Sequence, residues 1–121
     1  MTQPIQGPEE QHDLVIMTIT DFEGQLIRLT ARQWSHILQS RSFMVGMQSA
    51  IQGTLESPEE VRKDRDDPDS VRLYYRRYTN TPAGDKLVCV VVKFLENDAF
   101  ILTAFPTSRI RRGELIWAKE S

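Results

Sequence analysis

The fold is decided by two apolar runs and the polar turn between them: Leu87-Val-Cys-Val-Val-Val-Lys-Phe-Leu95, Glu96-Asn-Asp98 and Ala99-Phe-Ile-Leu-Thr-Ala-Phe105. The first run is almost continuously apolar and rich in valine, which predicts a central strand covered in part on both faces. The turn is so short that the second run must return antiparallel beside the first. These residues therefore predict a β-hairpin at the centre of an antiparallel sheet.

The turn also predicts a register for this hairpin. If Leu95 pairs with Ala99, then Lys93 pairs with Ile101 and Val91 pairs with Thr103. Side chains alternate between the two faces of a strand, so Lys93 and Thr103 share a face. The other face is apolar and is expected to support the helices: Val88, Val90, Val92, Phe94, Phe100 and Leu102.

Two further strands are predicted around the hairpin. The aromatic-rich stretch 71–78 precedes it across a turn at 79–85, and 114–118 follows it after a basic loop at 106–113. The turn at 79–85 is too long to fix a register, so the sequence leaves open which of Tyr74, Tyr75 and Arg76 lie beside Lys93. The charged run 59–69 predicts a solvated loop around a short strand or turn.

The N-terminal half predicts a hairpin and two helices. Residues 14–20 and 25–29 read as strands joined by a turn, and Thr30 is a predicted N-cap for a helix over 31–40. Apolar residues from Phe43 to Leu55 follow a second helical repeat. The predicted fold class is α+β, with an N-terminal β-hairpin, two helices and then a four-stranded antiparallel sheet. Residues 14–118 form one domain, and the acidic tail 1–13 is expected to be disordered.

Composition excludes several classes of function. The 121 residues carry a net charge of −2, contain no apolar run long enough to span a bilayer, and begin without a secretory signal. The lone cysteine, Cys89, excludes an internal disulfide and favours a reducing cytoplasm. The chain has no Cys/His cluster, phosphate-binding glycine loop, paired acids or elbow serine, so we predict no metal and no cofactor.

The arginines are concentrated where acids are missing. Three acid-free stretches, 24–55, 70–84 and 99–113, hold most of them: Arg28, Arg32, Arg41, Arg72, Arg76, Arg77, Arg109, Arg111 and Arg112. The planar guanidinium suits phosphate recognition. If the fold brings these stretches together, a positive site forms on an acidic protein. Otherwise the arginines are spread over the surface.

His36 is the only histidine in the predicted domain. On the helix over 31–40 it shares a face with Arg32, while Trp34 falls on the core face. A histidine with arginines, a lysine, tyrosines and a threonine suits metal-free RNA cleavage, which needs a proton donor or acceptor and cationic groups near the phosphate. We expect Arg32, Tyr74, Arg76 and Arg109 to bind RNA. Taken singly, each of these residues also has an ordinary structural explanation.

The order of short motifs resembles the phage-associated branch of the barnase–EndoU–colicin–RelE-like nucleases. The motifs span Leu14 to Trp117: Asp21-x-x-Gly24, Leu29-Thr-x-x-x-Trp34-x-His36-Ile37, Pro58-x-x-Val61, Leu73-Tyr-Tyr-Arg76, Val90-Val-Val-Lys93, Ile101-Leu-Thr-Ala-Phe105 and Gly113-Glu-x-x-Trp117. The resemblance implies a barnase/RelE-like fold and an RNA-cleaving or RNA-binding role in toxin or phage settings. RNA is then the partner, with room for an inhibitor or antitoxin protein. It implies a site built from His36, Arg41, Lys93 and Thr103.

One position departs from the family pattern. Relatives commonly have a second histidine where this chain has Arg41, and arginine cannot exchange a proton at neutral pH. A tyrosine with a pKa lowered by nearby arginines is one replacement, and loss of cleavage with retained RNA binding is the other.

Three hypotheses follow. The first is a metal-independent endoribonuclease in which His36 is the acid or base, Arg41 and Lys93 stabilise the phosphate, and Thr103 with Tyr74 or Tyr75 positions it. The second is an RNA-binding module with a degenerate site. The third is an interaction protein whose acidic tail and segment 56–69 bind a basic partner.

Overall fold

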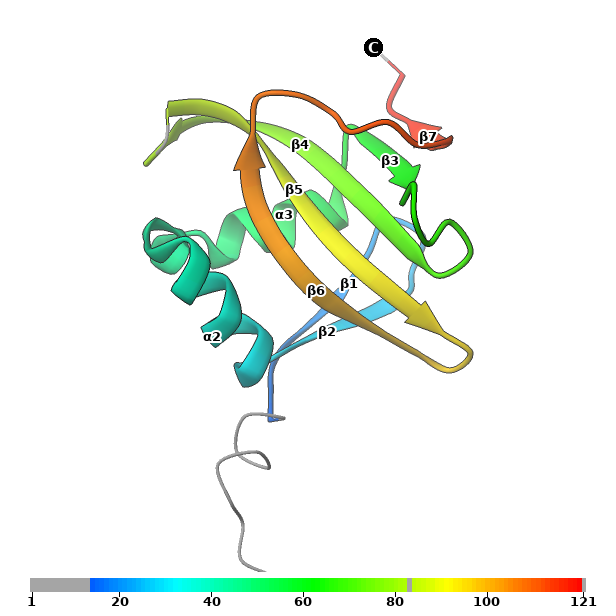
Figure 1. Cartoon of the computed structure of the whole chain (residues 1–121), viewed down its shortest axis with the longest axis horizontal. Coiled ribbons are helices and arrows are strands. Elements are labelled where there is room, and N and C mark those ends of the chain that lie inside the picture. Colours follow the sequence, from blue (N-terminus) through cyan, green and yellow to red (C-terminus); the bar gives the residue numbers. More distant parts are fainter. Residues whose placement is uncertain (1–13, 83, 121) are drawn as a thin grey trace, which may run out of the picture.

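The computed structural model describes residues 14–82 and 84–120, which form one seven-stranded mixed sheet with two helices (Figure 1). The strand order is β1-β2-β6-β5-β4-β3-β7. The strands are β1 (Val15–Thr20), β2 (Leu26–Thr30), β3 (Glu60–Lys63), β4 (Val71–Thr81), β5 (Gly84–Leu95), β6 (Asp98–Thr107) and β7 (Leu115–Ala118). The helices are α2 (Ala31–Ser40) and α3 (Gln48–Glu56), joined by the 3-10 turn η1 (Ser42–Gly46). Neither helix of the described ranges is long and apolar enough to cross a membrane.

The central hairpin is confirmed, but its register differs from the prediction at the turn end. β5 and β6 are antiparallel, and Leu95 pairs with Asp98 rather than with Ala99. A β-bulge lies between Val91 and Val92, so that Lys93 pairs with Phe100 while Val91 still pairs with Thr103. The tighter turn shifts the register by one residue, and the bulge takes up that extra residue.

The predicted four-stranded antiparallel sheet of a barnase/RelE-like fold is wrong. The N-terminal hairpin joins the sheet, because β2 lies parallel to β6 at the pair Arg28 and Phe100. The charged run contributes β3, which pairs with both β4 and β7. The last strand therefore lies at the far edge of the sheet, and the loop after β6 must cross the sheet to reach it (Figure 1).

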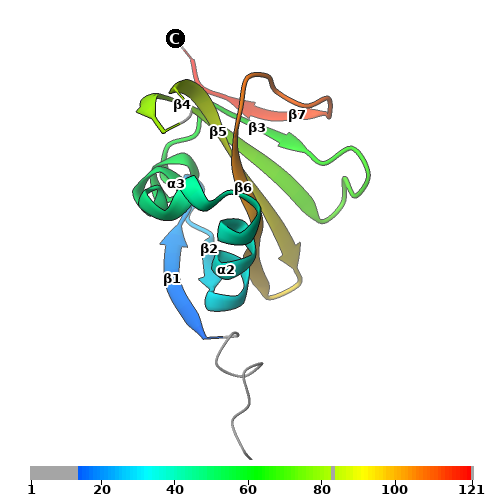
Figure 2. The same ribbon diagram turned by 60° about the vertical axis from the view of Figure 1, so that its left-hand side comes forward.

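The two faces of the sheet have different roles. The helices pack on one face over the main core, which includes Ile37, Met44, Ile51, Leu55, Tyr74, Val88, Val90, Val92 and Ile101 (Figure 2). The opposite face holds a smaller cluster: Val71, Leu73, Tyr75, Cys89, Val91 and Phe105. We call this opposite face the open face, because neither helix covers it.

Helix α2 begins directly after β2 and packs against β6 (Figure 2). The Thr30 hydroxyl accepts a hydrogen bond from the Gln33 amide at 3.2 Å, which confirms the predicted N-cap. Ile37 is fully buried, and Trp34 is partly buried against the main core. Because α2 lies against β6, the C-terminal end of the helix comes close to the end of that strand.

Candidate anion-binding site

Phe105 on the open face lies beneath two arginines. The guanidinium carbons of Arg41 and Arg111 lie 5.1 and 4.9 Å from the centre of its ring. The ring is only 7% exposed. Two cations beside one aromatic ring form a compact positive centre, since each is attracted to the ring while they repel one another. We call Arg41, Phe105 and Arg111 the arginine site.

Arg41 is positioned by the end of α2. Its backbone N–H donates to the Ile37 carbonyl at 2.9 Å, and its own carbonyl accepts from the Met44 amide at 2.9 Å. The residue thus closes α2 and opens η1. Its half-buried side chain can reach β6 because α2 and β6 are packed together.

Arg111 is positioned by contacts at both ends of the loop that crosses the sheet. Its backbone N–H donates to the Tyr75 hydroxyl at 3.0 Å. The carbonyl of Gly113 accepts from the Arg62 guanidinium at 2.8 Å, and a Cβ at Gly113 would overlap the carbonyl oxygen of Lys63. At the other end, the Thr107 hydroxyl donates to the Arg109 carbonyl at 3.0 Å. The loop is therefore fixed against β3 and β4.

Charge pairing distinguishes the arginine site from five other cations of the described residues. Several basic side chains lie beside carboxylates: Arg28 with Asp98, Arg62 with Glu60, Lys63 with Glu114, Arg72 with Glu23 and Lys93 with Asp67. Within residues 14–82 and 84–120, neither Arg41 nor Arg111 forms an ion pair with a carboxylate. Arg109 and Arg112 are exposed on the same loop as Arg111. The site is thus suited to an external anion.

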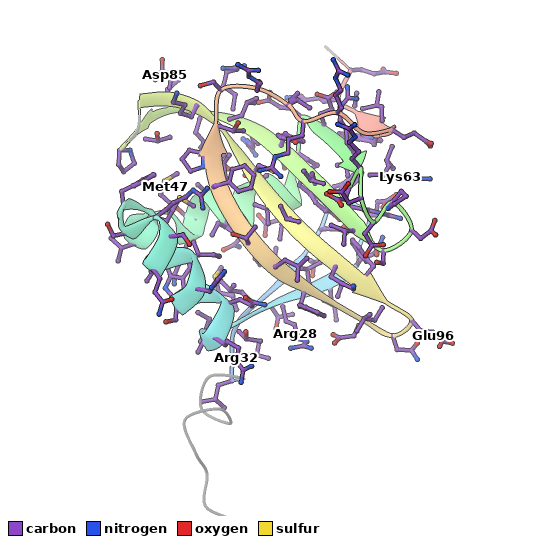
Figure 3. All side chains as sticks on the ribbon, in the orientation of Figure 1. Arg28, Arg32, Met47, Lys63, Asp85 and Glu96 are labelled. Atoms are coloured by element: carbon purple, nitrogen blue, oxygen red, sulfur yellow. The ribbon has the colours of Figure 1, made fainter. Side chains whose placement is uncertain are left out.

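The sequence-predicted residues on α2 lie apart from this site. His36 and Arg32 are both exposed, and His36 falls on the side of α2 away from buried Ile37. No hydrogen bond, ion pair or ring contact joins His36 to Arg41, Lys93 or Thr103 among the described residues. Figure 3 shows Arg32 near the start of α2, at the end of the helix remote from Arg41.

Lys93 and Thr103 lie on the open face, as predicted, although Ile101 between them faces the main core because of the bulge. Thr103 is half-buried, opposite Val91 and two residues before Phe105 on β6. The Lys93 ammonium lies 3.5 Å from the Asp67 carboxylate. The pKa of Asp67 is lowered by a hydrogen bond from the Ser70 hydroxyl and then by Lys93. Thr103 therefore adjoins the arginine site, whereas Lys93 is engaged further along the same face.

Tyr74 and Arg76 point to the helix-covered face. Tyr74 is fully buried, and its hydroxyl donates to Asp21 at 2.7 Å. Arg76 donates to the carbonyls of Gly53 and Ser57, each at 3.3 Å, at the C-terminal end of α3. Both residues therefore hold elements together in this structure and lie outside the arginine site.

Tyr75 lies under the site but cannot replace a histidine as an acid or base near neutral pH. Burial raises the pKa of its hydroxyl above the usual value, and the neighbouring Cys89 adds to the rise, although Arg111 opposes it. The interpretation that arginines lower a tyrosine pKa is therefore wrong for Tyr75. Burial likewise raises the pKa of the Cys89 thiol to about 12, so this cysteine is not a nucleophile at neutral pH.

Phe105 and Arg111 were missing from the residues predicted for the site. The available signal was the acid-free stretch 99–113, which places three arginines just after β6. Among the described residues no group of three or more His, Cys, Asp or Glu side chains could hold a metal ion. Comparison with family models, curated proteins and solved structures gave no match for this chain.

Proposed function

We propose that this protein binds single-stranded RNA on the open face of its sheet, with the arginine site as the phosphate contact. The observation that carries the proposal is the position of Arg41 and Arg111 over one buried ring without a carboxylate partner in the described residues. Stacking on the ring leaves guanidinium N–H groups for phosphate oxygens. The outer guanidinium planes are then available to unpaired bases.

The open face along β6 offers a path for a strand of RNA. Phe100 lies at the other end of β6 and pairs with Lys93, which places its ring on the open face. The Arg28 guanidinium, which is paired with Asp98, lies 5.3 Å from the centre of that ring. Thr103 lies between the two rings. Aromatic rings with cations beside them are typical of surfaces that bind single-stranded nucleic acid without sequence preference.

The test is the salt dependence of RNA affinity, measured by fluorescence anisotropy with a short unstructured RNA. Arg41→Ala and Arg111→Ala should each weaken binding about tenfold at low salt. Each should also reduce the slope of log affinity against log salt by about 0.7, the value for one phosphate contact on a single strand. Arg72→Ala is the matched control, because Arg72 pairs with Glu23 and stacks on Phe94, away from the site. Absence of binding, or equal losses in all three variants, contradicts the proposal.

Cleavage stays a prediction that the same RNA can test. The protein and a His36→Ala variant are incubated with labelled RNA in the presence of a chelator, and the products are separated on a gel. Cleavage that disappears in the variant supports the nuclease hypothesis, while intact RNA in both leaves binding alone. A cytoplasmic location fits either result, since both RNA and a reduced cysteine are expected there.

A further inference from the structure

A cavity of about 510 Å³ lies on the open face, between β4, the end of β7 and the loop that crosses the sheet. Tyr75 of β4, Leu87 of β5 and Ile110 of the loop supply its apolar lining. Ile110 packs against the apolar cluster of the open face, and the Tyr75 hydroxyl accepts from the Arg111 amide at 3.0 Å. The volume falls within the range of about 300–1,000 Å³ that is typical of sites for small organic groups.

The cavity adjoins the arginine site. Ile110 lines the cavity, and the next residue, Arg111, lies over Phe105. Because Cys89 of β5 pairs with Phe105, Leu87 lies one strand and two residues away from that ring. Those two steps measure about 5 Å and about 7 Å. A nucleotide whose phosphate lies at Arg111 can therefore bring its own base or the neighbouring base to the cavity.

The border of the cavity is charged but neutral overall. Its charged side chains are Glu59, Glu60, Arg77, Lys119 and Glu120. Glu60 is paired with Arg62, which leaves two acids and two bases. A phosphate in the cavity would lie among carboxylates, whereas the arginine site offers two cations without a carboxylate partner in the described residues. The charge of a nucleotide thus favours the arginine site, and the cavity suits a neutral group.

Glu59 provides an acceptor that is held in place at this border. Its amide donates to the Tyr75 carbonyl, and its carbonyl accepts from the Lys119 amide, each at 2.8 Å. Its carboxylate oxygen Oε2 accepts from the Arg77 amide at 3.1 Å. Within residues 14–82 and 84–120, the second oxygen, Oε1, accepts no hydrogen bond. An acceptor fixed at the border of an apolar cavity suits a flat group that carries N–H donors on its edge.

We propose that this cavity receives an unpaired base of the bound RNA, next to the phosphate that the arginine site holds. The inference rests on the proposed function and adds a site for the base to it. A nucleobase is flat and neutral and carries both donors and acceptors on its edges, which matches the apolar lining and the mixed border. Phosphate and base are then bound by two separate parts of the open face.

Ala118→Leu tests the cavity and leaves the residues of the arginine site unchanged. Ala118 ends β7, lines the cavity and is exposed, so the fold should tolerate a larger aliphatic side chain that fills the entrance. Fluorescence anisotropy measures the affinity of the full chain for two ligands of equal length. One is a short unstructured RNA, and the other is the same ribose-phosphate chain without bases.

Ala118→Leu should weaken binding of the RNA about tenfold, within the range for one bound base, and leave the affinity for the abasic chain unchanged. The slope of log affinity against log salt should keep its wild-type value, because no phosphate contact is lost. Leu115→Phe is the matched control, since it enlarges an exposed side chain of β7 that does not line the cavity. It should change neither affinity. Circular dichroism checks that both variants are folded.

Three results would overturn the base site and leave the phosphate contact in place. The first is an Ala118→Leu variant that binds RNA as tightly as the wild type. The second is an equal loss of affinity for the RNA and for the abasic chain. The third is a loss in Leu115→Phe as large as that in Ala118→Leu. A wild-type protein that binds no RNA at all would overturn the proposed function, and the base site with it.

Discussion

Tyr74 and Tyr75 are consecutive residues with the same side chain, and both are fully buried, but their hydroxyls serve opposite faces of the sheet. The Tyr74 hydroxyl donates to the Asp21 carboxylate at 2.7 Å and ties β4 to the turn after β1. The Tyr75 hydroxyl accepts from the Arg111 amide at 3.0 Å and ties β4 to the loop of the arginine site. One tyrosine stabilises the fold, and its neighbour positions a group at the surface.

The difference comes from the alternation of side chains along a strand. On the helix-covered face the Tyr74 hydroxyl binds the buried Asp21 carboxylate of a turn. On the open face the Tyr75 hydroxyl binds the backbone of the loop that crosses the sheet. Replacing either tyrosine with phenylalanine removes a single oxygen atom. The two changes should therefore separate stability from RNA binding.

The largest effect is expected for Asp21→Ala. The Asp21 side chain is almost fully buried and accepts hydrogen bonds from the amides of Glu23 and Gln25 and from the Tyr74 hydroxyl. Its loss leaves the Tyr74 hydroxyl buried without its acceptor, so the free energy of unfolding should fall by about 3 kcal/mol. Urea denaturation followed by circular dichroism measures this value.

The control for Asp21 is Asp98→Ala. Asp98 pairs with Arg28 at a site where both side chains are more than a third exposed, so the loss should be below about 1 kcal/mol. Equal losses in the two variants would contradict the structural importance of the Tyr74–Asp21 contact.

The next effect is a loss of stability at alkaline pH. In the folded protein the pKa of Cys89 is raised to about 12, and burial raises the pKa values of Tyr74 and Tyr75 as well. The unfolded chain releases these protons at lower pH, so the stabilisation is complete below about pH 9 and is lost as pH rises toward 12. Each group can contribute a slope of up to about 1.4 kcal/mol per pH unit. Urea unfolding across this range should give a smaller slope for Cys89→Ala than for the wild type, and identical slopes would count against the assignment.

The sequence could predict individual strands better than their arrangement. The apolar run of β5 and the turn after it are local signals, and they gave the central hairpin. The pairing of β2 with β6 joins residues far apart in the chain, so no local pattern indicates it. β3 contains one apolar residue, Val61, and its charged neighbours are tolerated because Arg62 pairs with Glu60.

In the candidate site, too, local sequence patterns predict one part and the folded arrangement determines the rest. Lys93 and Thr103 share one face as predicted, but only because the bulge compensates for the shifted turn. Phe100 and Leu102, which were predicted for the helix-covered face, lie on the open face instead. The contact of Arg41 and Arg111 with Phe105 depends on how α2 packs on β6 and on a loop that crosses the sheet. Neither depends on a local pattern, and the arginine site could therefore be recognised only in the folded chain.

A smaller effect, which tests the comparison of Tyr74 with Tyr75 directly, is expected for Tyr75→Phe. The free energy of unfolding should fall by about 1 kcal/mol, because the Arg111 amide loses its acceptor while it is partly exposed to water. RNA affinity should fall a few-fold as the loop loosens. Tyr74→Phe is the matched control: it should cost at least as much stability and leave RNA affinity unchanged. Fluorescence anisotropy measures the RNA affinity of both variants. Equal affinities would show that Tyr75 does not position the arginine site.

The smallest effect concerns Lys93, whose ammonium is held near Asp67 at 3.5 Å. Both side chains are more than a third exposed, so Lys93→Ala should change stability by less than about 0.5 kcal/mol. Asp67→Asn is more informative, because the amide can still accept from the Ser70 hydroxyl while the negative charge beside Lys93 is removed. If RNA follows β6 past Phe100, the released lysine should strengthen binding about twofold and steepen the salt dependence. Unchanged affinity in Asp67→Asn would confine the RNA contact to the arginine site and leave Lys93 as a structural cation of the open face.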